Sequence, residues 1–128
     1  MNGEKIRSFT DLKVWQQGHG LAIFVYNLTK KFPKQEIYCL VSQMRRAAIS
    51  ITSNIAEGFG RRGYKEKIQF YYLAQGSLIE LKNQILLAKD LGYVDGKDFQ
   101  LIVEKANNTH KLLQGLITAS KKFLNHNS

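Results

Sequence analysis

Apolar residues recur at helical spacing through long stretches of this chain, and that periodicity most strongly limits what it can fold into. Only one proline, Pro33, and glycines clustered at a few points interrupt these stretches. No segment alternates cleanly between apolar and polar residues, as a half-buried strand does. Four long helical segments with short connections predict an all-α protein, folded as an antiparallel up-and-down four-helix bundle.

Capping and chain-breaking residues predict where each helix begins and ends. Thr10 can cap the first helix, Pro33 suits the first turn of the second, and Gly92 can end the third. Asp95 and Asp98 can cap and charge the start of the fourth. The expected helices cover about residues 10–30, 33–57, 64–91 and 95–124.

Apolar spacing also predicts which side of each helix is buried. In the second helix the stripe comprises Ile37, Leu40, Val41, Met44, Ala48, Ile51 and Ile55. In the fourth it comprises Phe99, Ile102, Ala106, Thr109, Leu113, Leu116, Ser120 and Phe123. The first helix has two rows, with Leu12, Trp15, His19, Ala22 and Tyr26 on one face and Val14, Leu21, Val25 and Leu28 on another. The third is also apolar on several sides, with one row formed by Phe70, Leu73, Ser77, Leu81 and Ile85. This surplus indicates self-association, or else a wider core.

Length and composition predict one domain over residues 1–128, with short flexible tails at about 1–8 and 125–128. The single cysteine, Cys39, excludes an intramolecular disulfide and fits a reducing compartment. The longest apolar run, residues 21–26, is far too short to span a bilayer, and the N-terminus lacks an apolar signal segment. We therefore expect a cytoplasmic protein with no membrane association.

The net charge of +9 is concentrated in one part of the sequence. Residues 30–67 carry nine basic and three acidic side chains, a net charge of +6. Such a concentration favours a polyanionic partner, RNA or DNA. The alternative is the solvated surface of a basic protein.

No arrangement of residues predicts catalysis. Gly58, Gly60 and Gly63 have the spacing of a dinucleotide-binding turn, but the segment before them is helical, whereas that turn follows a strand. The three histidines lie on separate elements, and the Glu-x-x-His pairs of di-iron bundles are absent. We expect a protein that is not an enzyme and has no cofactor or metal.

A polar stripe follows one flank of the second helix at spacings of three and four. It consists of Gln43, Arg46, Ser50, Asn54 and Glu57. Arg46 needs an acceptor, which Glu57 or a residue of another helix can supply. We interpret the stripe as a structural network at a helix–helix or subunit interface, with a ligand site as the alternative.

A basic cluster surrounds an aromatic residue just after this helix. Arg61, Arg62, Lys65 and Lys67 flank Tyr64, which suits phosphate contacts combined with stacking on an unpaired base. We predict these four cations and Arg45 as phosphate contacts, with Tyr64 as a stacking surface. The alternative for the cluster is a solvated helix entry.

Several motifs resemble one known family over roughly residues 9–120. They are Phe9-x-x-Leu12-x-x-Trp15, Phe32-Pro33-x-x-Glu36-x-x-x-Leu40-x-x-Gln43, Arg46-Ala47-Ala48-x-Ser50-Ile51-x-x-Asn54-Ile55-Ala56-Glu57-Gly58 and Gly76-Ser77-Leu78-x-Glu80-Leu81. The chain resembles the bacterial four-helix-bundle proteins of the 23S rRNA-intervening sequence type. The resemblance implies a compact bundle that assembles into a homopentamer. A related group of pentameric, basic bundles serves as accessory protein to reverse transcriptases.

Charge and resemblance together give one expected function and one alternative. We expect a non-catalytic homo-oligomer, a pentamer by resemblance, that binds RNA or DNA through a basic face with little sequence preference. The alternative is an interaction scaffold or accessory subunit whose basic surface docks an acidic partner protein, such as a reverse transcriptase.

Overall fold

The structure is a bundle of four long helices and, over the residues it describes, contains no strand. It is a computed structural model that describes residues 5–127, with side chains as far as Leu124. The long helices are α1 (Lys13–Thr29), α2 (Ser42–Phe59), α3 (Tyr64–Asp90) and α4 (Gly96–Asn127). The all-α prediction is confirmed.

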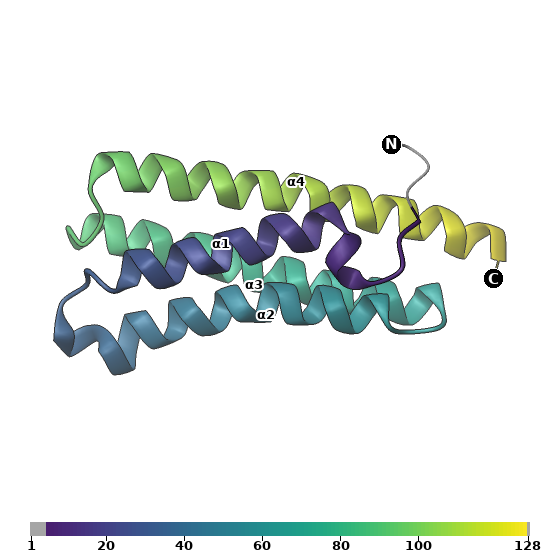
Figure 1. Ribbon diagram of the computed structural model, residues 1–128, viewed down its shortest axis with the longest axis horizontal. Coiled ribbons are helices and arrows are strands. Elements are labelled where there is room, and N and C mark those ends of the chain that lie inside the picture. Colours follow the sequence, from purple (N-terminus) through teal and green to yellow (C-terminus); the bar gives the residue numbers. More distant parts are fainter. Residues whose placement is uncertain (1–4, 128) are drawn as a thin grey trace.

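The helices follow one another up and down the long axis (Figure 1). Each packs against the next in sequence, and α4 also packs against α1, which closes the bundle. Two ends result, which we name by what lies there. The loop end holds the start of α1, the α2–α3 loop at residues 60–63 and the last turns of α4. The opposite end holds the connections α1–α2 and α3–α4.

The chain enters the bundle through a capped 3₁₀ turn, η1 (Phe9–Asp11). Ser8, and not Thr10 as expected, is the cap: its Oγ accepts from the Thr10 amide at 3.3 Å. Asp11 completes a capping box by accepting from the Ser8 amide at 3.1 Å. Backbone hydrogen bonds from Arg7 and Ser8 hold the pKa of Asp11 below its usual value. At the other terminus α4 continues through Asn127, and residues 1–4 and 128 of the expected tails lie outside the described residues.

The second helix begins in stages instead of continuously from Pro33. A 3₁₀ turn, η2 (Lys34–Glu36), leads into a π-helical segment, η3 (Ile37–Val41), before α2 starts. Glu36 holds this segment in place, because its carboxylate accepts hydrogen bonds from the Tyr93 hydroxyl at 2.7 Å and from the Leu40 amide at 3.4 Å. The wider π turn shifts the register of the side chains, so Ile37 is exposed and does not join the core as expected.

The end of α3 and the start of α4 agree with the sequence. Gly92 adopts a φ of +81° just after the helix, which favours glycine. The amides of Gly92 and Tyr93 donate to the carbonyls of Lys89 (2.9 Å) and Ala88 (3.0 Å), which makes a Schellman motif. Asp95 then caps α4 by accepting from the Asp98 amide at 2.8 Å.

The core confirms the stripes expected for the second helix from Leu40 onward and for most of the fourth helix. On α1 the row that is buried is Val14, Leu21, Val25 and Leu28. On α4, Phe123 is exposed and Leu116 only partly buried. None of the helices in the described part is long and apolar enough to span a membrane.

On α3 the expected row is only partly right. Leu81 and Ile85 are buried, but Leu73 is 57% exposed, and Tyr71 and Leu78 take its place in the core. The outward side of α3 is nevertheless apolar. Its exposed apolar residues are Tyr72, Leu73, Ile79, Leu86 and Leu87, and the exposed Leu91 follows directly after the helix. Five residues of this helix and the one that follows it are therefore large apolar side chains that the single chain leaves 43–57% exposed.

Candidate nucleic-acid interface

Positive charge gathers at the loop end. Its described residues include nine cations against three carboxylates, a net charge of +6. The cations are Lys5, Arg7, Lys13, Arg61, Arg62, Lys65, Lys67, Lys121 and Lys122, and the carboxylates are Asp11, Glu57 and Glu66. The opposite end is close to balanced, with six cations against four carboxylates. The cations of this end are Lys30, Lys31, Lys34, Arg45, Lys89 and Lys97, and its carboxylates are Glu36, Asp90, Asp95 and Asp98.

Three predicted phosphate contacts lie at the surface of this end. Arg62 and Lys65 are exposed and form no ion pair or hydrogen bond within the described residues. Arg61 is exposed too, but its Nη2 pairs with Glu57 Oε2 at 3.0 Å and its guanidinium lies 4.7 Å from the centre of the Phe70 ring. Of the predicted contacts at this end, Arg62 and Lys65 are therefore the most available to a phosphate.

Lys67 has a structural contact instead. Its Nζ donates to the carbonyl of Phe59 at 2.6 Å, at the C-terminus of α2, where an ammonium also meets the negative end of the helix dipole. The ammonium lies 5.3 Å from the Phe59 ring centre and 5.8 Å from that of Tyr64. Burial lowers the pKa of Lys67. A phosphate would have to compete with these contacts.

Tyr64 is half-buried and stacks on Phe123 of α4, with ring centres 5.0 Å apart and planes 15° from parallel. The two rings join the start of α3 to the last described turns of α4. Together with Arg62, Gly63 and Leu124 they line an open groove. Phe123 is the aromatic neighbour that sequence reasoning did not connect with the cluster.

Arg45 lies apart from the other predicted contacts. Sixteen residues separate it from Arg61, or about 24 Å along a helix. At the opposite end, its Nε donates to Thr29 Oγ1 at 3.0 Å and its Nη2 to the Tyr26 carbonyl at 3.4 Å. Its guanidinium also lies 4.6 Å from the Tyr26 ring centre. The fold thus divides the predicted phosphate contacts into two separate places.

The polar stripe follows the contact between α2 and α3. Arg46 Nη2 donates to Glu80 Oε2 at 2.8 Å and to Gln43 Oε1 at 3.0 Å. One turn further, the hydroxyls of Ser50 and Ser77 are 2.7 Å apart. The residues of α3 that meet the stripe belong to the Gly76-Ser77-Leu78-x-Glu80 motif.

Asn54 and Glu57 extend the stripe along α2. Asn54 Nδ2 donates to the carbonyl and hydroxyl oxygens of Ser50 at 2.9 and 3.1 Å. Glu57 accepts from Arg61, as described above. The acceptor of Arg46 is therefore Glu80 on another helix, one of the two possibilities that the sequence left open.

Gly58 belongs to the same helix contact. A Cβ atom at this position would lie 2.7 Å from Tyr71 Cε1 and 2.9 Å from Phe70 Cβ. The glycine allows the end of α2 to approach α3, and it is itself helical. The dinucleotide-like spacing from Gly58 to Gly63 therefore begins inside a helix, and the segment before it is helical, as expected.

Within the described residues, no group of three or more His, Cys, Asp or Glu side chains could hold a metal ion.

Comparison with known proteins identifies the chain's relatives. The family described as 23S rRNA-intervening sequence protein matches residues 10–115. A crystal structure from Bacteroides thetaiotaomicron, of a protein of unknown function from the S23 ribosomal protein family, has the same fold with a TM-score of 0.76. The two sequences are 21% identical, and the match covers 82% of this chain and 95% of that one. No curated protein matches the chain. The chain belongs to the family of 23S rRNA-intervening sequence proteins.

Proposed function

We propose that this protein is a non-catalytic homo-oligomer that binds RNA or DNA through the loop end of the bundle, with little sequence preference. The observation that carries the proposal is the clustering of nine cations against three carboxylates at that end. Phosphate neutralisation supplies most of the affinity of sequence-independent binding, and it needs accessible cations on one face. A base-reading helix or loop is not required.

Arg62 and Lys65 are the central contacts in this proposal, because they are exposed and unpaired within the described part of the chain. Arg61 contributes by exchanging Glu57 for a phosphate. Lys122 is exposed on α4, one residue before Phe123, which stacks on Tyr64 beside Arg62. Tyr64 and Phe123 offer an aromatic surface for an unpaired base.

Self-association supports the proposal by repeating this charge. The five exposed apolar residues on α3, with Leu91 just after it, form the kind of surface that oligomers cover. Five copies of a chain with charge +9, as the family resemblance implies, give a formal charge of +45. Weak phosphate contacts in each subunit then combine through multivalency.

The test compares two triple variants that remove the same charge. The first is Arg62→Gln with Lys65→Gln and Lys122→Gln at the loop end. The control is Lys30→Gln with Lys34→Gln and Lys97→Gln, exposed lysines of the opposite end. Fluorescence anisotropy with a mixed-sequence single-stranded RNA is measured between ~50 and ~200 mM salt.

We expect the loop-end variant to bind at least about tenfold more weakly at ~0.1 M salt and with a shallower salt dependence. The control should lose much less. Equal losses would mean that total charge, and not the loop end, determines binding. If the parent does not bind at ~50 mM salt, the nucleic-acid proposal fails and docking to an acidic protein replaces it.

Light scattering tests the oligomer separately. We expect a particle several times larger than the 14.7 kDa chain. Leu73→Gln combined with Leu87→Gln should shift it toward the monomer, since both side chains are exposed in the single chain and their loss leaves its core intact. A parent that is monomeric at micromolar concentration would contradict this part of the proposal.

A further inference from the structure

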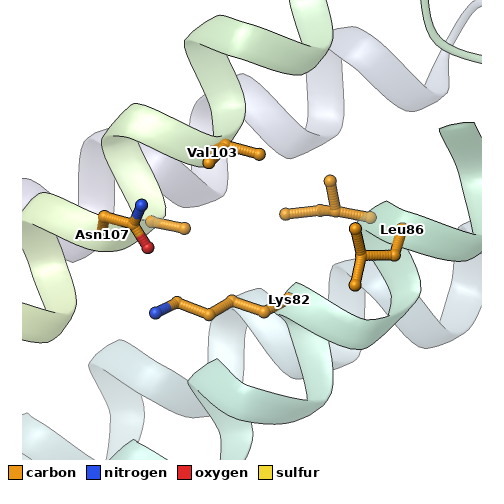
Figure 2. Close-up of a pocket in the computed structure, with 6 residues that line it drawn as sticks. Lys82, Leu86, Val103 and Asn107 are labelled. Carbon is orange, nitrogen blue, oxygen red and sulfur yellow. The ribbon is translucent and has the colours of Figure 1, made fainter.

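A pocket of about 170 Å³ lies between α3 and α4, away from both the loop end and the polar stripe. It is lined by Lys82, Ile85 and Leu86 of α3 and by Val103, Ala106 and Asn107 of α4. Figure 2 shows that the Lys82 ammonium and the Asn107 carboxamide lie at one side of the pocket, and Leu86 and Val103 at the other. The pocket therefore has an apolar end and a polar end, where the Lys82 ammonium is a donor and the Asn107 carboxamide can donate through its nitrogen.

Lys82 is held at the polar end by a neutral partner. Its Nζ lies 2.7 Å from His110 Nδ1, and it can only donate, so that ring nitrogen must carry a lone pair. The proton of a neutral imidazole is then on Nε2, 3.5 Å from the Gln75 side-chain amide. The nearest atom of that amide is its nitrogen, Nε2, so the amide accepts the hydrogen bond from the ring N–H only when it is turned by 180° to place its oxygen there. Burial and the Lys82 charge both lower the pKa of His110, which agrees with a neutral ring.

The charge of Lys82 has no counter-ion in the described residues. No carboxylate among them lies within 4.0 Å of its Nζ, although the side chain is half-buried. Burial without a counter-ion disfavours the ammonium and lowers the pKa of Lys82. An anion at this end of the pocket would restore the interaction that the charge loses with water.

The size of the pocket limits what the anion can be attached to. A dry apolar cavity of about 150 Å³ accommodates a benzene-sized molecule, whereas drug-sized ligands need about 300 Å³ or more. The pocket therefore has room for one ring or one short branched chain. Ile85, Leu86 and Val103 provide the apolar contact for it.

We propose that the α3–α4 pocket is a binding site for a small carboxylate with an apolar body, whose carboxylate meets the Lys82 ammonium and the Asn107 amide while its ring or chain packs on Ile85, Leu86 and Val103. This site does not depend on nucleic-acid binding at the loop end, and since Leu86 also belongs to the exposed apolar side of α3, an oligomer must leave that residue accessible. A small ligand with a few contacts of this kind binds with a Kd of order 1 mM.

Benzoate is the probe, and saturation-transfer NMR on the whole protein measures its binding. Benzamide has the same shape without the charge, and acetate has the charge without the ring. We expect benzoate to bind at least about tenfold more tightly than either. Equal binding of benzamide would overturn the role of Lys82, and equal binding of acetate would overturn the role of the apolar end.

Three variants assign the site. Lys82→Gln removes the ammonium and should weaken benzoate binding about tenfold or more. Lys111→Gln removes an exposed charge one turn from Asn107, outside the pocket, and should leave the Kd unchanged. Val103→Phe places a ring in the pocket and should abolish binding. Wild-type affinity in both Lys82→Gln and Val103→Phe, or no benzoate signal at ~20 mM in the parent, would overturn the proposal.

Discussion

Replacing Gly58 by alanine tests how closely α2 and α3 approach. The new Cβ would lie 2.7 Å from Tyr71 Cε1 and 2.9 Å from Phe70 Cβ, both shorter than real Cβ contacts. Tyr71 is 2% exposed and cannot turn away into solvent. The Phe70 Cβ is fixed to the backbone of α3, so relief requires the helix itself to move.

The expected magnitude is the balance of two effects. Alanine is about 0.8–1.0 kcal/mol more favourable than glycine inside a helix. Overpacking a filled core costs about 1–3 kcal/mol. The sum is a destabilisation of about 1 kcal/mol for Gly58→Ala. Gly76→Ala is the matched control, since Gly76 is also inside a helix but nothing lies within 4 Å of its added Cβ. It should stabilise by about 0.5–1 kcal/mol.

The assay is urea unfolding of both variants and the parent at one fixed protomer concentration, because the proposed self-association would make stability depend on concentration. The two free energies of unfolding should differ by about 2 kcal/mol, with opposite signs relative to the parent. If Gly58→Ala stabilises as much as Gly76→Ala, the close contact inferred between the two helices is refuted.

Three further predictions concern side-chain contacts. Lys67→Met should lower the free energy of unfolding by about 1–2 kcal/mol, because it leaves the Phe59 carbonyl without its donor, and it should lower RNA affinity less than Lys65→Gln does. Urea unfolding and fluorescence anisotropy measure the two effects, and a variant as stable as the parent would contradict the capping role. A double-mutant cycle on Arg46 and Glu80 should give a coupling energy below about 1 kcal/mol that falls with salt, because the two side chains are 58% and 40% exposed. A coupling energy above about 2 kcal/mol would contradict this exposure and indicate that a second copy of the chain buries the pair. Since the pKa of His110 in the folded protein lies below 6.5, the unfolded chain binds more protons under mildly acidic conditions, and stability should fall as the pH drops below 6.5. Thermal unfolding between pH 5 and 7.5 should show a smaller loss of stability for His110→Gln than for the parent, and the same pH dependence in both proteins would contradict the prediction.

The helical architecture could be predicted because it depends on local signals. Periodicity gave four helices, and residues such as Asp95 and Gly92 placed two of their boundaries correctly. Local signals fail where they compete. Both Ser8 and Thr10 are good caps, and only the position of Asp11 three residues after Ser8 distinguishes them. The π turn at residues 37–41 has no signature in the sequence.

The buried side of α3 could not be read from periodicity. Apolar residues surround most of this helix, so several rows have helical spacing and none is unique. Packing against the neighbouring helices determines that Tyr71 is buried and Leu73 is exposed, and the residues of those helices are distant in sequence. The Arg46–Glu80 pair has the same difficulty, since 34 residues separate its members.

Part of the candidate interface could be predicted from the sequence. Local clustering located Arg62 and Lys65, but it could not show that the Lys67 ammonium turns back onto the Phe59 carbonyl. Lys13 and Lys122 were missed because they are distant from the cluster in sequence. The up-and-down topology itself is the signal that finds them, because it brings the start of α1 and the end of α4 to the α2–α3 loop (Figure 1).

The unequal charge of the two ends makes each bundle an electric dipole along its long axis. A polyanion several ångströms away exerts a torque on such a molecule as well as an attraction, so the bundle turns its loop end forward before contact. A larger fraction of collisions then occurs in an orientation that permits binding. The association rate constant therefore rises above the range of about 10⁵–10⁷ M⁻¹ s⁻¹ that is typical without electrostatic steering. Screening shortens the distance over which this alignment operates to about 8 Å at physiological ionic strength. If the protein binds a polyanion as proposed, salt should therefore slow the encounter as well as weaken the complex, and stopped-flow measurements would separate the two effects.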